Sequence, residues 1–425
     1  NYFMKKKYLR SSEWFDNPKD PGLTALYLEK YLNYGLKRKD LQSGKPIIGI
    51  AQSGSDLAPC NRHFLELSKT IKDGIREAGG VPMEFPTHPI QETGKRPTAG
   101  LDRNLSYLSL VEVLYGYPID GVILTTGCDK TTPAALMAAA TVNIPSIVLS
   151  GGPMLDGSYK GKKAGSGTII WEARRLYAKG EIDYEEFMEM AEASAPSIGH
   201  CNTMGTASSM NSIAEALGMS LTGGAIIPAP YKEREAISFK TGKRIVEMVH
   251  EELTPSKIMI KKAFENAIYV ASAIGASSNC PPHLTAIAKH MGIDFGIDNW
   301  DKLGRDIPLL VNCQPAGEHL MEGFFKAGGV PAIMQELMKN NKLHKKLITV
   351  TGKTVEENLK NKIEVDCDII KSFKNPLVKN AGFVVMKSNF FNSAIMKTSV
   401  ISAEFRKRYL SNPKSLNVFS AKAVV

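Results

Sequence analysis

The sequence predicts an α/β protein in which a parallel sheet with flanking helices is followed by the start of a β-rich module. From Lys45 onward, short runs rich in β-branched residues alternate with segments of helical periodicity, which is the pattern of parallel strands joined by crossover helices. From about residue 368 that periodicity fades. At 425 residues the chain is also longer than one hydrophobic core usually supports. We therefore expect an N-terminal α/β domain over residues 1–367 and a second, incomplete domain over residues 368–425.

The first unit of this pattern combines a buried strand over residues 46–51 with an amphipathic helix. A polar loop over residues 52–59 separates the two. Apolar residues then recur at spacings of three and four until Gly79 and Gly80 end the segment. The apolar positions of this predicted helix are Phe64, Leu67, Ile71, Ile75 and Ala78.

The same unit repeats further along the chain. A strand is predicted over residues 121–124 and a turn at Gly127, and a Thr-Thr-Pro sequence at 131–133 starts a helix, where the missing N–H of proline is harmless. A helix of small residues over 134–140 and a strand over 146–149 follow.

Helices dominate the chain beyond this point. The predicted helical segments are an acidic region over residues 169–195 and further helices over 207–217, 239–252, 257–273 and 284–291. Strands are expected over 382–386, from Val418 onward and at 423–425. Because the last strand lacks a terminating turn, we expect the chain to stop within a domain.

Composition excludes several classes of protein. Hydrophobic content of 43% and charged content of 23% are ordinary for a globular protein, and no apolar run reaches the ~18 residues that cross a bilayer. The net charge of +10 comes from scattered lysines without interleaved aromatic residues, so no nucleic-acid partner is expected. Six cysteines without regular spacing favour free thiols or metal ligands over disulfides. The sequence therefore predicts a cytoplasmic protein without a membrane partner.

Three cysteines occupy polar loops that lead into predicted helices. Cys60 and Cys128 follow predicted strands, and Cys201 lies in the loop before a helix. Such loops gather at one edge of a parallel sheet, where a helix N-terminus favours the thiolate form. A single free cysteine is most often a small buried hydrophobe, but three in equivalent loops can converge on one iron–sulfur cluster. Three thiolates in place of four leave an iron with an open position, which favours Lewis-acid catalysis over electron transfer.

A site for a hard cation is predicted beside this cluster. Asp129 directly follows Cys128, and Glu92 in the sequence PIQETG is the second carboxylate that we select. Mg²⁺ usually takes one or two protein carboxylates together with substrate oxygens and water. Lys130 follows Asp129 and would ordinarily face solvent.

These motifs resemble the dihydroxy-acid and sugar-acid dehydratase family. The similar segments are SGSDLAPCN at 53–61, TGCDKTTP at 126–133, CNTMGTASSM at 201–210, GGPML at 151–155, GSGT at 165–168 and EALGM at 215–219. The resemblance implies that Cys60, Cys128 and Cys201 hold an iron–sulfur cluster, [2Fe–2S] in preference to [4Fe–4S]. It also implies that Glu92, Asp129 and a carbamylated Lys130 bind Mg²⁺.

The reaction that this resemblance implies is the removal of water from a 2,3-dihydroxy carboxylic acid, which gives a 2-keto-3-deoxy acid. Mg²⁺ holds the carboxylate and the 2-hydroxyl, the cluster iron assists loss of the 3-hydroxyl, and a base removes the C2 proton. Asn202 and Thr203 after the third cysteine and Thr131 after the Cys-Asp-Lys triplet look like the aldonate branch, closest to the pentonate dehydratases. The alternative is the dihydroxy-acid dehydratase of branched-chain amino acid biosynthesis.

Two departures from the family pattern affect these expectations. Cys280, in SNCPPHL at 278–284, takes the place of a small residue. Family members continue through a β-barrel-like C-terminal domain that carries the catalytic serine base, so we expect only the truncated start of that domain and no base serine here. An inactive cofactor-binding fragment is therefore the alternative of a different class. The resemblance further implies a small hydroxy-acid substrate as partner and a homodimer or homotetramer.

Overall fold

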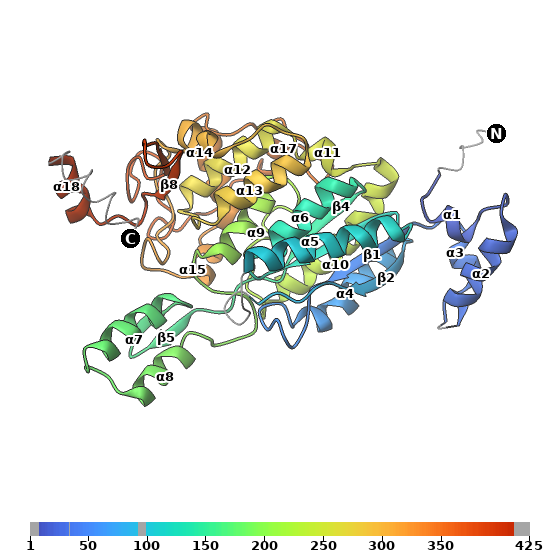
Figure 1. Ribbon diagram of the computed structural model, residues 1–425, viewed down its shortest axis with the longest axis horizontal. Helices are drawn as coiled ribbons and strands as arrows, with labels where there is room; N and C mark the ends of the chain where they lie inside the picture. Colours follow the sequence, from blue (N-terminus) through green and yellow to red (C-terminus); the bar gives the residue numbers. More distant parts are fainter. Residues whose placement is uncertain (1–7, 34, 92–98, 412–425) are drawn as a thin grey trace.

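The computed structural model describes residues 8–33, 35–91 and 99–411 and has a central α/β body (Figure 1). The strands are β1 (Ile47–Gln52), β2 (Val81–Pro86), β3 (Gly121–Thr126), β4 (Ser146–Ser150), β5 (Gly157–Tyr159), β6 (Lys162–Ala164), β7 (Phe383–Met386) and β8 (Ala394–Lys397). The helices are α1 (Ser12–Phe15), α2 (Pro21–Leu32), α3 (Arg38–Leu41), α4 (Phe64–Glu77), α5 (Ala99–Gly116), α6 (Thr131–Val142), α7 (Thr168–Ala178), α8 (Tyr184–Glu192), α9 (Thr206–Ala216), α10 (Lys232–Glu251), α11 (Pro255–Ile258), α12 (Lys261–Ala273), α13 (Cys280–His290), α14 (Ile297–Gly304), α15 (Met321–Lys326), α16 (Gly329–Lys339), α17 (Val355–Asn358) and α18 (Ala403–Ser411).

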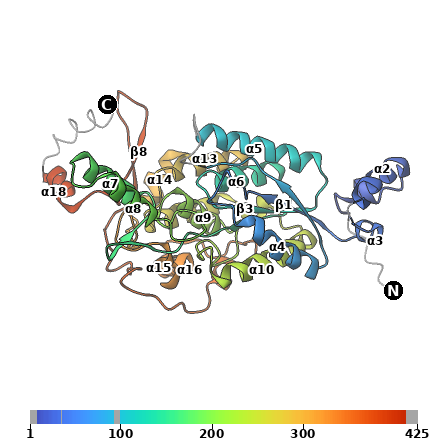
Figure 2. The ribbon, with the colours of Figure 1, turned by 90° about the horizontal axis from the view of Figure 1, so that it is seen from below.

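The centre of the body is a four-stranded parallel sheet with the order β2-β1-β3-β4. Every residue of β1, β3 and β4 is buried, as expected for strands covered on both faces. Helices α4 and α10 pack together along one face, whereas α5 and α6 lie on the other (Figure 2). The predicted α/β class with a parallel sheet and flanking helices is therefore confirmed.

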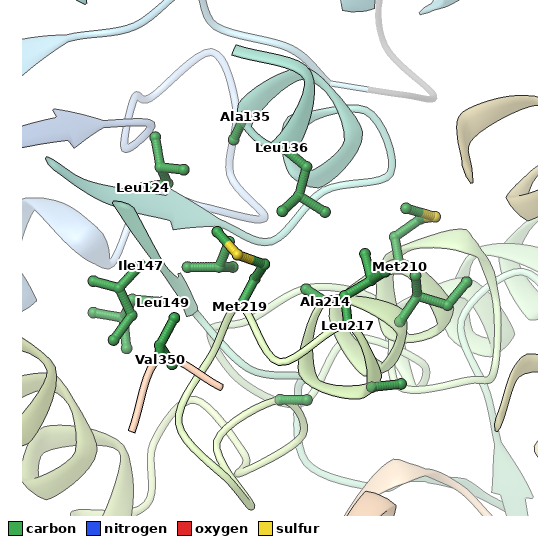
Figure 3. Packing of buried hydrophobic residues seen from close by; sticks show 14 of the residues in the cluster. Leu124, Ala135, Leu136, Ile147, Leu149, Met210, Ala214, Leu217, Met219 and Val350 are labelled. Carbon is green, nitrogen blue, oxygen red and sulfur yellow. The ribbon is translucent and has the colours of Figure 1, made fainter. Parts of the chain in front are cut away.

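The main hydrophobic core lies between this sheet and the helices that follow it in the chain. Leu124 of β3 lies on the side of the sheet that α6 covers, whereas Ile147 and Leu149 of β4 lie on the opposite side near Val350 (Figure 3). On the other side of α6 the core continues into α9, where Met210 and Leu217 are fully or almost fully buried. This packing fixes the ends of β1, β3 and β4 relative to the start of α9.

Two smaller parts project from the body. Helices α1 to α3 lie at one end (Figure 1), and the Ser11 hydroxyl ties them to the body by donating to Asp120 Oδ2 at 2.7 Å. The β5–β6 hairpin forms an arm with α7 and α8. This arm has its own small core, which consists of Ala164, Ile169, Ala173 and Met190.

The described part of the second predicted region is a hairpin followed by a helix. The predicted strand at 382–386 is confirmed as β7, which pairs antiparallel with β8. The hairpin packs on α14, where the rings of Trp300 and Phe383 meet edge to face at 4.9 Å between centroids. Helix α18 was not predicted, and the strands expected from Val418 and at 423–425 lie outside the described residues.

The predicted strands and helices of the body are present, but α10 begins at Lys232, well before the predicted residue 239, and the predicted helix at 257–273 is divided between α11 and α12. Sequence analysis did not predict several other elements of the body. Strand β2 and helix α5 are the largest omissions. Helix α5 has apolar residues around most of its circumference and therefore little periodicity. In the part of the chain that the structure describes, we find no helix long and apolar enough to span a bilayer.

Glu322 at the start of α15 joins the arm to the body, and its contribution to stability should depend on pH. Its carboxylate accepts hydrogen bonds from the backbone N–H of Asp156 at 3.0 Å, from the Tyr231 hydroxyl at 2.7 Å and from Lys326 at 2.6 Å. Burial alone would raise the pKa of Glu322, but these donors lower it from 4.5 to about 2. A carboxyl whose pKa is depressed by folding stabilises the protein above its unfolded pKa and loses that contribution as the pH falls.

We expect Glu322→Gln to lower the free energy of unfolding by about 1 kcal/mol at pH 7. The difference from the parent protein should shrink as the pH falls from 4.5 towards 2, because the parent carboxylate is then protonated. Denaturant unfolding at a series of pH values measures this, with Glu185→Gln on the exposed surface of α8 as the control. A difference that stays constant down to pH 2 would contradict the assignment.

Candidate active site

The structure brings the three predicted cysteines together from three separate loops. Cys60 lies in the turn between β1 and α4, and Cys128 lies between β3 and α6. Cys201 precedes α9, in a segment that pairs with the chain after β4 through a bridge between Pro153 and His200. All three loops therefore meet at the carboxyl edge of the parallel sheet, where ligands bind in open α/β proteins.

The three thiols are close enough to influence one another's ionisation. A hydrogen bond with Cys128 lowers the pKa of Cys60. Burial raises the pKa of Cys201 to about 12, and the charges of Asp129 and Cys128 act in the same direction. The thiols must therefore release protons when they bind a metal centre, as metal-binding thiols generally do.

Two side chains hold the Cys128 loop in place: Thr131 at the start of α6 and Asn61 in the Cys60 loop. The Thr131 hydroxyl donates to the Cys128 carbonyl at 2.8 Å and accepts from the backbone N–H of Gly127 at 3.0 Å. The backbone N–H of Cys128 donates to Asn61 Oδ1 at 2.9 Å. A Cβ atom at Gly127 would collide with that same Asn61 oxygen, so glycine permits the close approach of the two loops.

Asn211 on α9 links the Cys128 loop to the Cys201 loop. Its Oδ1 accepts from the hydroxyls of Thr126 and Thr132 at 2.9 and 3.1 Å, and its Nδ2 donates to the Gly127 carbonyl at 3.3 Å. The same amide approaches Nε2 of the fully buried His200 at 3.4 Å. Burial lowers the pKa of His200 to about 3, so the ring is neutral and can accept this bond.

The structure describes two of the three residues that are predicted to bind Mg²⁺. Asp129 is half-buried and lies near the thiols, and Lys130 is buried at the start of α6. Glu92 lies outside the described residues. Within the ranges that the structure describes, no group of three or more His, Cys, Asp or Glu side chains is arranged to hold a metal ion. The ligand roles of the three cysteines and of Asp129, Lys130 and Glu92 therefore stay predictions.

His283, from a distant segment of the chain, lies near Lys130. His283 on α13 contacts Arg103 of α5 through Nδ1 at 3.0 Å. Burial lowers the pKa of His283 to about 3, with further contributions from Lys130 and Arg103. Nothing in the spacing of these residues in the sequence marks His283 as a neighbour of Lys130.

Lys397 and Cys280 form a second group that sequence analysis did not assign to the site. Cys280 is fully buried at the start of α13, and burial raises the pKa of its thiol to about 12. The charges of Lys397 and Asp129 both act on this thiol. Lys397 at the end of β8 therefore lies close to the site, although more than 250 residues separate it from Cys128 in the sequence.

A cavity of about 890 Å³ opens beside Cys60 and Cys201. Its wall is mostly apolar, with residues from α4, the loop before Cys201 and the start of α10. His63 and Tyr231 supply polar atoms to this wall. The cavity is large enough for a small organic acid and gives access to two of the three thiols.

The residues around the thiols fit a bound iron–sulfur centre. The side-chain nitrogen Nδ2 of Asn61 is buried and has no hydrogen-bond partner in the described part of the chain. The Gln91 amide donates to the Cys60 sulfur at 3.4 Å. A thiol that accepts from an amide, with two further thiols beside it, suits a sulfur-rich metal centre, because sulfide and thiolate sulfurs accept such hydrogen bonds.

Comparison with known proteins assigns the class of enzyme. The family model described as "Dihydroxy-acid/6-phosphogluconate dehydratase N-terminal" matches residues 45–358, which include all three cysteine loops. The chain belongs to the dihydroxy-acid/6-phosphogluconate dehydratase family and is a hydro-lyase. The family predicted from the sequence motifs is therefore confirmed.

Individual relatives place the chain within that family. It is 58% identical over 416 residues to D-xylonate dehydratase from Caulobacter vibrioides, covering 98% of this chain and 70% of the relative. It is 44% identical over 405 residues to L-arabinonate dehydratase from Rhizobium leguminosarum bv. trifolii, covering 94% and 69%. A dihydroxy-acid dehydratase from Acetivibrio thermocellus is 37% identical over 371 residues, covering 86% and 67%. The chain is thus similar to the sugar-acid branch, as its sequence predicts.

Proposed function

We propose that this protein removes water from a sugar acid, most closely a pentonate, to give the 2-keto-3-deoxy acid. The observation that carries the proposal is the meeting of Cys60, Cys128 and Cys201 beside Asp129, in a chain 58% identical to a D-xylonate dehydratase. The similarity to an enzyme named for L-arabinonate supports a five-carbon acid as the substrate class.

We further propose that the three cysteines hold an iron–sulfur cluster, [2Fe–2S] in preference to [4Fe–4S], and that Glu92, Asp129 and carbamylated Lys130 hold Mg²⁺. When bound, these groups supply Lewis acidity to the leaving hydroxyl and charge stabilisation to the carboxylate. Asp129 interacts electrostatically with the thiols, which supports two neighbouring sites. A cytoplasmic homodimer or homotetramer belongs to the same proposal.

The described residues position the cysteine loops and limit the access of water to a bound acid. Asn211 and Thr131 hold the Cys128 loop in one conformation through the hydrogen bonds given above. The apolar wall of the cavity beside Cys60 and Cys201 limits the water around a bound acid. The buried Lys130 lies near the neutral ring of His283, whose other neighbour is Arg103. We assign the removal of the C2 proton to none of the described residues.

Turnover of a panel of acids tests this proposal. The protein expressed from its complete gene and reconstituted with iron, sulfide and Mg²⁺ is incubated with D-xylonate, L-arabinonate, D-gluconate and 2,3-dihydroxyisovalerate, and keto-acid formation is measured. We expect kcat/KM for a pentonate to exceed that for 2,3-dihydroxyisovalerate by about tenfold or more. Preference for 2,3-dihydroxyisovalerate would favour the branched-chain enzyme, and no keto acid from any substrate would favour a cofactor-binding module.

A further inference from the structure

The Asn61 side chain is held in a single orientation between the loops that carry Cys60 and Cys128. It follows Cys60 directly in the chain and is fully buried. Its Oδ1 accepts the backbone N–H of Cys128 at 2.9 Å. Because a backbone N–H can only donate, the amide oxygen must face Cys128 and the NH₂ group must take the other side.

The NH₂ group of Asn61 has no acceptor among the described residues. Burying a hydrogen-bond donor without a partner destabilises a folded protein, and buried amides almost always find one. A 180° flip of the Asn61 amide would not remove this cost, because the NH₂ group would then face the peptide N–H of Cys128, which needs an acceptor. The missing acceptor must therefore come from outside the described residues.

The surroundings of Asn61 point to sulfur as that acceptor. Its neighbours in sequence and in space are Cys60 and Cys128, whose thiols contact each other. On the other side of Cys60, the Gln91 amide already donates to the Cys60 sulfur at 3.4 Å. Asn202 and Asn211, the other asparagines of these loops, differ from Asn61 because their Nδ2 atoms have carbonyl partners, Leu155 and Gly127 respectively.

We propose that Asn61 is a positioning residue whose Nδ2 donates a hydrogen bond to a sulfur atom of the iron–sulfur centre held by Cys60, Cys128 and Cys201. The inference rests on the proposed function, because it requires the centre to be present. Such a bond withdraws electron density from sulfur and raises the reduction potential of the centre. The same amide would then bind the backbone of Cys128 through its oxygen and the centre through its nitrogen, so that it fixes the position of one relative to the other.

The first test uses the unmodified protein. The chain is labelled with ¹⁵N only at the side-chain amide of asparagine, reconstituted with iron and sulfide, and reduced to a paramagnetic state. We expect a ¹⁵N hyperfine coupling from a side-chain amide in the electron spin-echo spectrum. A spectrum without any such coupling, from protein that contains the centre, would overturn the inference.

The second test uses Asn61→Asp, which keeps an acceptor for Cys128 but replaces the donating NH₂ group by oxygen. We expect the ¹⁵N coupling to disappear, the reduction potential to become more negative, and the centre to be lost several-fold faster to an iron chelator. The matched control is Asn266→Asp, because Asn266 is equally buried but bonds only to the backbone of His344. This control should leave the potential and the coupling unchanged.

The outcomes separate the inference from the proposed function. Wild-type protein that binds no iron after anaerobic reconstitution overturns the cluster itself. Wild-type protein with its full centre, together with an Asn61→Asp protein of unchanged potential and unchanged chelation rate, overturns only the role of Asn61. If Asn61→Asp fails to fold, a labelled wild-type spectrum without any side-chain amide coupling still overturns the inference.

Discussion

Replacing Cys128 by serine is expected to abolish binding of the iron–sulfur centre and to lower dehydratase activity by more than about 100-fold. Mutating residues that only support metal ligands already lowers metal affinity or activity by about 10- to 100-fold, so the loss of a ligand should exceed that. Cys128 is the most deeply buried of the three thiols and contacts Cys60. Serine preserves its size but lacks the soft thiolate that iron–sulfur centres require.

Iron and sulfide content, visible absorption and activity after anaerobic reconstitution measure this effect. Cys367→Ser is the matched control, because Cys367 is exposed and free, and it should retain the iron content of the parent protein. Circular dichroism verifies that both variants fold. A folded Cys128→Ser protein with unchanged iron content would contradict the role assigned to Cys128.

Replacing Arg234 by leucine is expected to lower the free energy of unfolding by about 3–5 kcal/mol. The Arg234 guanidinium is fully buried and donates to the carbonyls of Ser150 at 2.5 Å and Gly224 at 3.0 Å, and also to Ile227. Burial lowers the pKa of Arg234 to about 9, which leaves it charged at neutral pH. Leucine would leave these carbonyls without donors and remove the positive charge near the buried Glu215.

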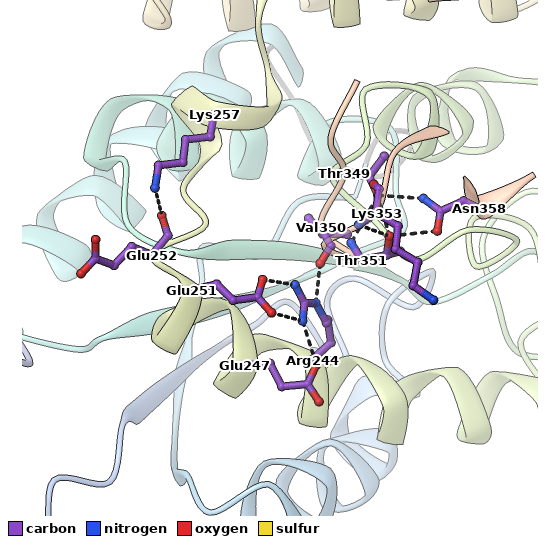
Figure 4. Close-up of polar contacts among 10 residues, drawn as sticks. All are labelled: Arg244, Glu247, Glu251, Glu252, Lys257, Thr349, Val350, Thr351, Lys353 and Asn358. Atoms are coloured by element: carbon purple, nitrogen blue, oxygen red, sulfur yellow. Dashed lines mark hydrogen bonds and ion pairs between the residues drawn. The ribbon is translucent and has the colours of Figure 1, made fainter. Parts of the chain in front are cut away.

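Arg244→Leu provides the comparison for this effect. Arg244 on α10 pairs with Glu247 and Glu251 and donates to the Val350 carbonyl (Figure 4). Both glutamates are about half exposed, at 54% and 45%, so water screens the pairs, while the Arg244 side chain itself is 11% exposed. The lost pairs and the lost bond to the Val350 carbonyl should together cost about 1–2 kcal/mol. Denaturant unfolding of the two variants measures both effects. Equal destabilisation by the two substitutions would contradict the role given to burial.

The fold was largely predictable because the sheet strands are short apolar runs bounded by glycine. β1, β3 and β4 are buried on both faces and therefore read as continuous β-branched segments. Strand β2 escaped because it is at the edge of the sheet, where its residues are only partly buried and include Pro82 and Glu84. Helix α18 escaped because its sequence is strongly polar.

The candidate site was predictable only where its residues lie in the cysteine loops themselves. Cys60, Cys128 and Cys201 follow or precede predicted elements, so the topology of a parallel sheet brings them to one edge. His283 and Lys397 reach the site from α13 and β8. Local sequence patterns do not predict contacts between segments that lie so far apart in the chain. Asn61 stands next to a predicted ligand, but its orphaned amide is a property of the three-dimensional structure alone.

Iron and acid-labile sulfide can be measured in the anaerobically reconstituted protein and in a variant in which serine replaces Cys60, Cys128 and Cys201. If the three thiols hold one [2Fe–2S] centre, the parent protein should contain two irons and two sulfides per chain, and the triple variant should contain neither. A parent protein without iron, or a triple variant that retains it, would contradict the account.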